Sequence, residues 1–401
     1  MILRGCIFLL IFVGVFDPAD RLLGLKVPAF ILCWLVFLIY FGLKPLKIMR
    51  GVYVYIFLML FIPVLSMFYF EVFLGGGQTA ALMLIKAHLF ASLIYILVAT
   101  KIDIIPMVCR ILCLLSLVII SVKFVVIIFP ELAPAIRIFG STYGILLLGH
   151  RTYANSVGFD QIYFVASPML VIAVAYYSDR ACKSVFFSWN SFFACASIVG
   201  MVLAGTRSNM IAPFLTLGIV LFLNSRNKVL LIAVLISTLI LFTSFFYSTI
   251  SEVLSLNEDS NASKLKLLQD YGDIFNDPVN LIFGQGFGSY YHWQIRGDYF
   301  ITELSYLELI RVYGLIFGTI MAGLVLYPIL FVMASKCEFP SRASITGFTV
   351  YMAIAALNPL IFSSLGMTII SAFVANVFRA REFYPVYQST ELSYNKSLGL
   401  D

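Results

Sequence analysis

The sequence predicts an all-α polytopic membrane protein with about 12 transmembrane helices, and two observations carry this prediction. First, 62% of the 401 residues are hydrophobic and only 11% are charged, with a mean hydropathy of +1.01. A soluble domain carries about 25% charged residues, so this chain could not cover a water-facing surface. Second, many apolar runs approach or reach the roughly 20 residues that a helix needs to cross about 30 Å of hydrocarbon.

The apolar runs define the expected helices in chain order. The first run, 5–16, is short but is followed by no small-x-small cleavage site, so we interpret it as a retained helix rather than a cleaved signal peptide. The tenth run is long, which predicts either a tilted helix or first turns that stand outside the bilayer. The expected spans are 5–16, 27–43, 52–70, 79–99, 107–129, 161–177, 189–204, 209–223, 229–248, 303–333, 345–360 and 361–378.

Basic residues in the short connections predict the orientation of these spans. Lys and Arg are concentrated on the inside when the N-terminus is placed inside, as the positive-inside rule requires. The expected topology is therefore N-in/C-in, with one membrane domain over 1–401 and two larger external loops at 130–160 and 249–302. Nucleotides and cytoplasmic phosphodonors do not occur on the external side, so chemistry in these loops has to use another donor.

Composition also narrows the classes of site. The chain has three His, and no Cys/His pair has zinc spacing, so a His-rich metal site is excluded and neither a metal nor a cofactor is expected. No nucleic acid is expected as a partner. The two halves differ in loop plan, and the central connection, 178–188, is short, which argues against a transporter built from two similar halves.

Arg207 is the first candidate for a functional role. It stands in the short turn Gly205-Thr-Arg-Ser between two expected spans, which places it at or just below the lipid headgroups. An arginine at that depth is costly unless it is paired or used, and its forked guanidinium suits a diphosphate. The structural alternative is that the side chain reaches out to lipid headgroups.

Glu303 is the second candidate, at the expected start of the tenth helix with Thr302 as its N-cap. Its carboxylate serves either as ordinary helix-start chemistry or as a general base for an incoming hydroxyl. Glu308 and Arg311 follow at i,i+3 spacing and are expected to form a structural pair. The preceding run Gly284-Gln-Gly-Phe-Gly either permits a tight turn with close backbone approach or cradles an oxyanion.

An aromatic run with basic members precedes Glu303. It contains Tyr290, Tyr291, His292 and Arg296. Tyr and Trp gather at membrane interfaces in any case, and aromatic faces also stack on sugar rings. The pattern leaves both interpretations open.

Together these motifs resemble the bacterial O-antigen polymerase and ligase superfamily. The resemblance covers the multi-spanning plan, and its specific motifs occupy about 200–210 and 281–318, including Phe283-Gly-Gln-Gly-Phe-Gly and Glu303-Leu-Ser-Tyr-Leu-Glu-Leu. The ligase branch has a His followed by Asn, Ser or Gln, then nine residues and a Gly. Here Glu303 and Leu304 take the first two places and Gly314 the last, so the resemblance favours a polymerase over a ligase.

The resemblance implies a glycosyltransferase of the bacterial inner membrane that acts at the periplasmic face on a glycan linked to polyprenyl diphosphate. In such a reaction Arg207 would stabilise the leaving diphosphate and Glu303 would activate the acceptor hydroxyl. The remaining substrate-binding candidates are Arg296, Arg137, Arg151, His292, Tyr290 and Tyr291. Membrane lipids are expected partners, and a chain-length regulator protein is an open one.

Three other functions stay open at the level of sequence. A ligase would transfer the finished glycan to another acceptor, a flippase or transporter would move the lipid-linked unit across the membrane, and a scaffold would do no chemistry. A transporter predicts pathway charges buried within several spans. Few such charges are present, among them Lys86, His88 and Lys123.

Overall fold

The computed structural model describes residues 1–42, 48–75, 78–153, 157–184, 188–229, 232–233, 236–237, 259–293, 297–299, 302–334 and 342–397. Within these ranges the chain is mostly helical, as an all-α membrane protein requires. The first half contains α1 (Ile2–Phe16), α2 (Lys26–Phe41), α3 (Arg50–Leu74), α4 (Gln78–Leu89), the 3₁₀ turn η1 (Phe90–Ser92), α5 (Leu93–Thr100), α6 (Ile105–Ile128), η2 (Pro130–Leu132), α7 (Ala133–Tyr143), the strands β1 (Leu146–Tyr153) and β2 (Val157–Phe164), η4 (Ser167–Met169), α8 (Leu170–Cys182) and α9 (Trp189–Leu203).

The second half of the chain is also mainly helical. It contains α10 (Arg207–Asn224), α13 (Asp259–Asn276), α14 (Pro278–Phe283), the strands β3 (Tyr291–Trp293) and β4 (Gly297–Tyr299), α15 (Ser305–Ala334), α16 (Arg342–Ala355), η5 (Pro359–Phe362) and α17 (Ser364–Ser397). The long helix α15 is two helices joined at Gly314, whose φ of 75° breaks the helical backbone.

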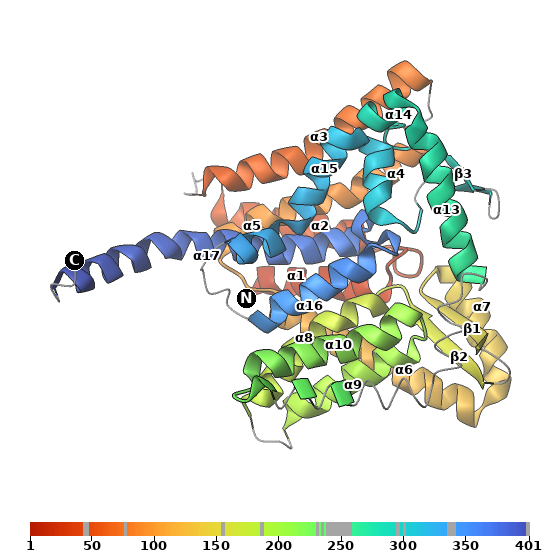
Figure 1. Ribbon diagram of the computed structural model, residues 1–401, viewed down its shortest axis with the longest axis horizontal. Coiled ribbons are helices and arrows are strands. Elements are labelled where there is room, and N and C mark those ends of the chain that lie inside the picture. The colour runs from red at the N-terminus through yellow and green to blue at the C-terminus, as the bar shows by residue number, and fades with distance from the viewer. Residues whose placement is uncertain are drawn as a thin grey trace.

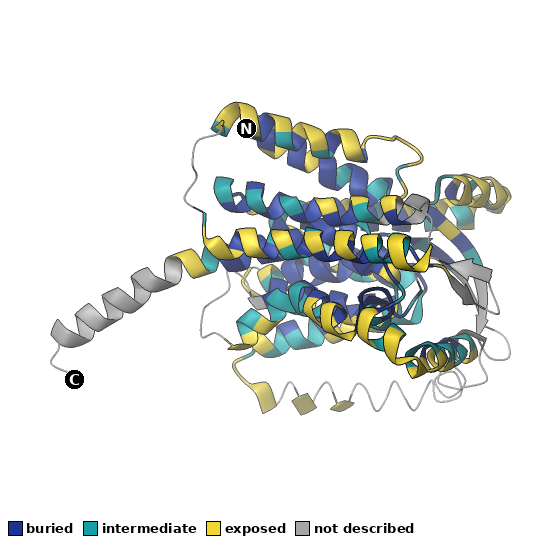
Figure 2. Cartoon of the chain, turned by 90° about the horizontal axis from the view of Figure 1, so that it is seen from above, coloured by how far each residue is buried: buried dark blue, intermediate teal, exposed yellow. Residues whose placement is uncertain are grey.

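Four of the described helices, α3, α6, α10 and α15, are long and apolar enough to cross a membrane by length and composition. Several shorter helices, including α1, α2 and α9, are also apolar. On α3, Phe57 and Phe68 are 58% and 56% exposed, and they lie on the outer surface of the helix. Figure 2 shows the same pattern more widely, with exposed positions on the outer helices and buried ones at the centre. Such apolar outer faces are suited to contact with lipid rather than water.

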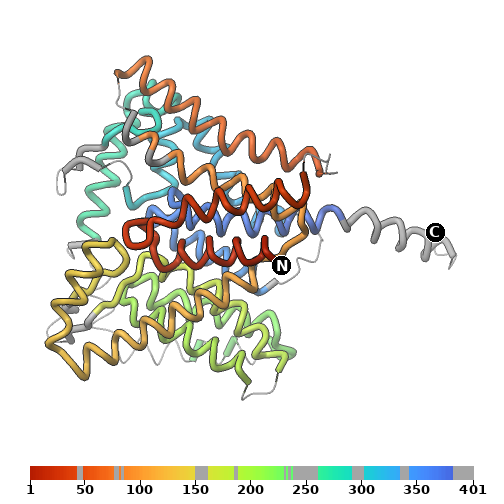
Figure 3. Tube along the Cα trace, turned by 180° about the vertical axis from the view of Figure 1, so that it is seen from behind, coloured from red at the N-terminus to blue at the C-terminus, as the bar shows by residue number. Residues whose placement is uncertain are grey.

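The centre of the molecule is built where helices from distant parts of the sequence meet. The start of α17 packs against α5 and α1, and Figure 3 shows this part of α17 beside the first two helices. Helix α8 is enclosed by α6, α9, α10 and α16, and its residues from Leu170 to Ser178 are all buried. Small residues allow this packing: a Cβ on Gly200 of α9 would come within 2.6 Å of Ser116 Cβ of α6.

Both segments expected to be long loops contain regular structure. Residues 130–160 include α7 and most of an antiparallel hairpin in which Leu146 pairs with Phe164 and Gly149 with Gln161. The described part of 249–302 contains α13, α14 and a second, shorter hairpin, β3–β4. Figure 1 shows both hairpins, α7 and α13 at one end of the molecule, whereas the N-terminus lies at the other end.

The structure differs from two of the expected spans, and a third cannot be compared. The expected span 161–177 begins as strand β2, because the apolar residues Ile162 and Phe164 belong to the hairpin, and the helix α8 starts only at Leu170. The expected span 79–99 is divided into α4, η1 and α5. Most of the expected span 229–248 lies outside the described residues.

Candidate functional site

The backbone around Arg207 holds this residue at the start of a helix. Gly205 has a φ of 71°, which turns the chain sharply after α9. Thr206 is then the N-cap of α10, and its hydroxyl accepts a hydrogen bond from the backbone N–H of Asn209 over 3.2 Å. Arg207 is therefore the first residue of α10, and its side chain is half-buried.

Contacts with two other elements fix this turn in place. The side chain of Asn209 is fully buried and donates to the hydroxyl of Ser167 in η4 over 3.1 Å. One terminal nitrogen of Arg207, NH1, donates to Oδ1 of Asn261 in α13 over 2.8 Å. The turn that carries Arg207 is thus attached to η4 on one side and to α13 on the other.

Glu303 does not begin a helix, and this part of the sequence prediction is wrong. Helix α15 starts two residues later, at Ser305. Thr302 is not its N-cap, because the Thr302 hydroxyl donates to the carboxylate of Glu308 over 3.2 Å. The chain here is held from the other side as well: the hydroxyl and the backbone N–H of Ser305 donate to the carbonyl oxygens of Asn358 and Ala356.

Burial separates Glu303 from its neighbours. Thr302, Leu304 and Ser305 are all buried, whereas Glu303 between them is partly exposed. A carboxylate on such a fixed segment has little freedom to move away, and solvent reaches part of it. This combination is what a general base needs.

The second acid in the region, Glu308, has a different environment. Its carboxylate and the guanidinium of Arg311 are both 0% exposed and form a two-pronged ion pair, with N–O distances of 2.6 Å and 2.9 Å. Arg311 also donates to Gln285 and Ser289, and Tyr271 of α13 donates to Glu308 over 2.6 Å. The expected i,i+3 pair is therefore confirmed. Because both charges are enclosed and satisfied, the pair is structural.

Tyr271 is well suited to be a donor in this network. Burial and the neighbouring Glu308 carboxylate both raise the pKa of the Tyr271 hydroxyl. The hydroxyl therefore keeps its proton and donates a hydrogen bond to Glu308. This hydrogen bond joins the C-terminal half of α13 to the first turn of α15.

The glycine run before Glu303 has a packing role. Gly284, Gly286 and Gly288 all have positive φ. A Cβ on Gly284 would lie 2.5 Å from the backbone nitrogen of Gly314, and one on Gly286 would lie 2.4 Å from Phe70 Cβ of α3. The backbone N–H of Gln285 donates to the carbonyl of Arg311 over 2.6 Å. The run thus seats the chain directly against the break in α15, as the close-approach interpretation predicted.

Tyr163 on strand β2 lies close enough to Glu303 for the charge of Glu303 to affect its pKa. Burial and the negative charge of Glu303 raise the pKa of the Tyr163 hydroxyl to about 12. Four residues beyond Tyr163, Ser167 receives the hydrogen bond from Asn209, close to Arg207. Helix α13 connects the two surroundings more directly, because Asn261 accepts a hydrogen bond from Arg207 and Tyr271 donates one to Glu308.

The remaining candidates are distributed around the same end of the molecule. Arg137 is exposed on α7, and Tyr290 is exposed just before β3. Arg151 lies on β1 opposite Phe159, while Tyr291 and His292 lie on β3 opposite Tyr299 and Asp298. Arg296 lies outside the described residues.

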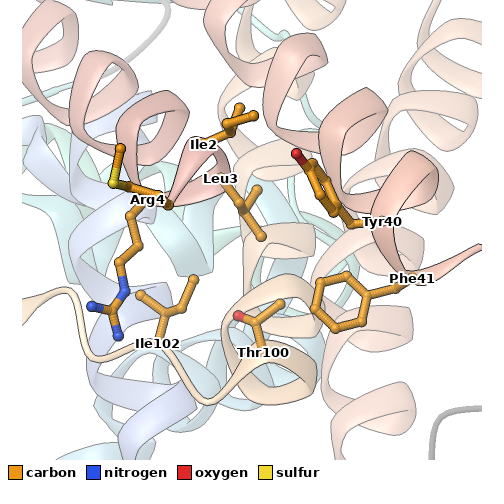
Figure 4. Close-up of a pocket in the computed structure, with 8 residues that line it drawn as sticks. Ile2, Leu3, Arg4, Tyr40, Phe41, Thr100 and Ile102 are labelled. Carbon is orange, nitrogen blue, oxygen red and sulfur yellow. The ribbon is translucent and has the colours of Figure 1, made fainter.

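A cavity of about 410 Å³ lies at the other end of the molecule, where α1 begins and α2 and α5 end. Its walls are mainly apolar, with Arg4 as the charged side chain (Figure 4). None of the residues that the sequence motifs single out lines this cavity, so it is separate from the candidate site.

No family model and no curated protein matches this chain. The fold and the site together define a helical protein with apolar, membrane-compatible outer faces and a polar end that holds a half-buried arginine and a partly exposed glutamate. The family resemblance noted from the motifs stays a prediction.

Sequence reasoning missed several members of this site. Tyr271 and Tyr163 carry no motif that marks them, and the glycosylation-type triplet Asn261-Ala-Ser does not predict a contact with Arg207; the roles of these residues arise from contacts between distant segments. A local signal did exist for the buried pair, because Glu308 and Arg311 stand three residues apart in an otherwise apolar helix.

Proposed function

We propose that this protein is a membrane glycosyltransferase that polymerises a surface polysaccharide of the O-antigen type. The substrate is a glycan repeat carried on polyprenyl diphosphate, and the acceptor is a sugar hydroxyl of another lipid-linked unit. The protein resides in the bacterial inner membrane with both termini inside, so that the hairpin end faces the periplasm. The observation that carries the proposal is the contrast between Glu303, which is partly exposed on a segment of buried neighbours, and Glu308, which is fully buried in an ion pair.

In the proposed reaction the acceptor hydroxyl oxygen attacks the anomeric carbon of the donor sugar. The bond between that carbon and the diphosphate oxygen breaks, and a glycosidic bond forms. Glu303 takes the proton of the hydroxyl as the bond forms. Arg207 stabilises the charge on the departing lipid diphosphate, and the proton finally leaves to the diphosphate or to water. No nucleotide is consumed, which suits an external site.

The positions of Arg207 and Glu303 in the structure support these roles. Arg207 lies at the start of α10, where the helix dipole also favours an anion. Helix α13 bonds to Arg207 through Asn261 and to Glu308 through Tyr271, which ties the two segments together. Fixed placement of reacting groups is a large part of catalytic power.

The test is incubation of the purified protein with a defined carrier-linked repeat and no nucleotide, followed by separation of the products by size. Wild type is expected to give a ladder of polymers, and Arg207→Ala and Glu303→Gln are expected to give none while inserting normally. Two exposed residues supply matched controls, Arg21→Ala and Glu131→Gln, which are expected to retain the ladder. A normal ladder from both site variants would disprove the assignment.

A bacterial strain from which the gene has been deleted separates the competing functions. Loss of a polymerase reduces the surface glycan to a single repeat, whereas loss of a ligase leaves core without any repeat. Loss of a flippase causes lipid-linked repeats to accumulate on the inner leaflet. Either of the latter two results would replace the polymerase proposal.

A further inference from the structure

Helix α13 carries a residue whose side chain contacts Arg207 directly. Asn261 and Arg207 are 54 residues apart in sequence, and the arginine NH1 donates to the asparagine Oδ1 over 2.8 Å. Arginine is only a donor, so the amide must present its oxygen to it. The contact therefore fixes both the direction of the guanidinium and the orientation of the Asn261 amide.

Helix α13 is itself anchored, so Asn261 is not on a freely moving segment. Tyr271, ten residues further on and about 15 Å along the helix axis, donates to Glu308 in the buried ion pair. Leu267 and Tyr271 are buried in a small apolar cluster with Leu304, the residue after Glu303. Helix α13 thus contacts both the segment that carries Glu303 and the side chain of Arg207.

The chemical nature of residue 261 matters as much as its position. An asparagine orients the guanidinium and adds no negative charge, whereas an aspartate at the same place would form a salt bridge with it. A diphosphate competes with any carboxylate that binds the same fork. A neutral acceptor therefore suits an arginine that has to bind a phosphate group.

We propose that Asn261 is a positioning residue that aims Arg207 at the diphosphate of a prenyl diphosphate ligand without placing a negative charge of its own beside the guanidinium. This inference rests on the role of Arg207 in the proposed function. It assigns to α13 the task of presenting an anion site, and it makes the amide at position 261 a determinant of ligand binding. Asn261 does not itself act on the reacting atoms.

The test uses Asn261→Asp, which changes charge with almost no change of shape. Gln269→Glu makes the same chemical change at an exposed position of the same helix and is the matched control. The probe is farnesyl diphosphate, whose affinity is measured by titration calorimetry on the full-length protein in detergent. We expect Asn261→Asp to weaken binding about tenfold or more, Arg207→Ala to abolish it, and Gln269→Glu to leave it unchanged.

Thermal stability distinguishes positioning from a purely structural role. The new salt bridge in Asn261→Asp is expected to keep or raise the melting temperature while affinity falls, and a structural role would lower both. In the polymer assay the variant should raise KM for the carrier-linked repeat. Asn261→Gln, which restores a neutral amide, should recover more affinity than Asn261→Asp.

The outcomes separate this inference from the proposed function. If polymer formation requires Arg207 but Asn261→Asp binds and reacts as wild type does, the positioning role is wrong and the glycosyltransferase stands. If farnesyl diphosphate binds with the expected dependence on Arg207 and Asn261 but no polymer forms, the diphosphate site stands and the polymerase does not. Failure of wild type to bind farnesyl diphosphate overturns the positioning role.

Discussion

The buried pair of Glu308 and Arg311 allows a quantitative test of how the candidate site is supported. Both side chains are 0% exposed and meet through two short contacts. Removing one partner leaves the other charge buried and uncompensated, which costs about 3–5 kcal/mol. Glu308→Leu and Arg311→Met are each expected to lower the free energy of unfolding by that amount.

The double variant Glu308→Leu/Arg311→Met should be much less unstable than the sum of the two single variants. It removes both charges together, and the neighbouring Tyr271 and Thr302 hydroxyls, which lose Glu308 as an acceptor, can then bond to each other. The cost of Gln285 and Ser289 losing a partner remains. We therefore expect the double variant to be about as unstable as one single variant, which corresponds to a coupling energy of about 3–5 kcal/mol.

The assay is a double-mutant cycle on the purified protein, with unfolding followed during titration with denaturing detergent. The pair of exposed Lys183 and partly buried Asp179 is the control, with a side-chain contact of 2.8 Å. Lys183→Met should cost less than about 1 kcal/mol. If the effects of the two buried substitutions simply add, or if they are no larger than that of Lys183→Met, the structural role of the buried pair is refuted.

Three further predictions concern the break in α15 and the polar groups at the hairpin end. Gly314→Ala should destabilise the protein by roughly 2 kcal/mol or more, because φ is positive and the new Cβ would meet the carbonyl oxygen of Ile282; Gly323→Ala, in open space, should be harmless, and equal melting temperatures for the two variants would contradict this. Because folding raises the pKa of Tyr163, its contribution to stability is complete below pH 10 and is lost as pH rises towards 12. Wild type should therefore lose stability in that range more steeply than Tyr163→Phe, and parallel pH profiles of the two proteins would count against this. Burial alone would raise the pKa of Asp17, but hydrogen bonds from the backbone N–H groups of Leu23, Leu22 and Arg21 lower it. Asp17→Asn should therefore reduce the free energy of unfolding by about 2 kcal/mol at pH 7 and by progressively less as pH falls below 3.8. A loss of stability that is independent of pH would show that the charge is not responsible.

The parts of the fold that could be predicted from sequence are those with a strong local signal. The expected spans 52–70 and 107–129 correspond to α3 and α6 because their apolar residues form unbroken runs of sufficient length. The pairing of Glu308 with Arg311 was also predictable, since both lie on one face of one helix.

The parts that failed depend on contacts between distant segments. Apolar residues of β2 extend the run that continues into α8, and hydropathy alone cannot separate a buried strand from a helix. Thr302 has the composition of an N-cap, but its hydroxyl bonds to Glu308. Asn261 reaches Arg207 only because the start of α13 comes beside the start of α10, and the 54-residue separation in sequence gives no signal of that contact.

The break at Gly314 has a consequence for how α15 is made. After the break, residues 315–334 supply roughly 20 mostly apolar positions, enough for one complete stop-transfer segment. The nine residues before it, which contain Glu308 and Arg311, need not enter lipid for the chain to be inserted. During biosynthesis the polar half can therefore remain at the water boundary until α13 and the glycine run, which are already synthesised, pack against it. The order of events along the chain favours this, because both of those segments are synthesised before α15.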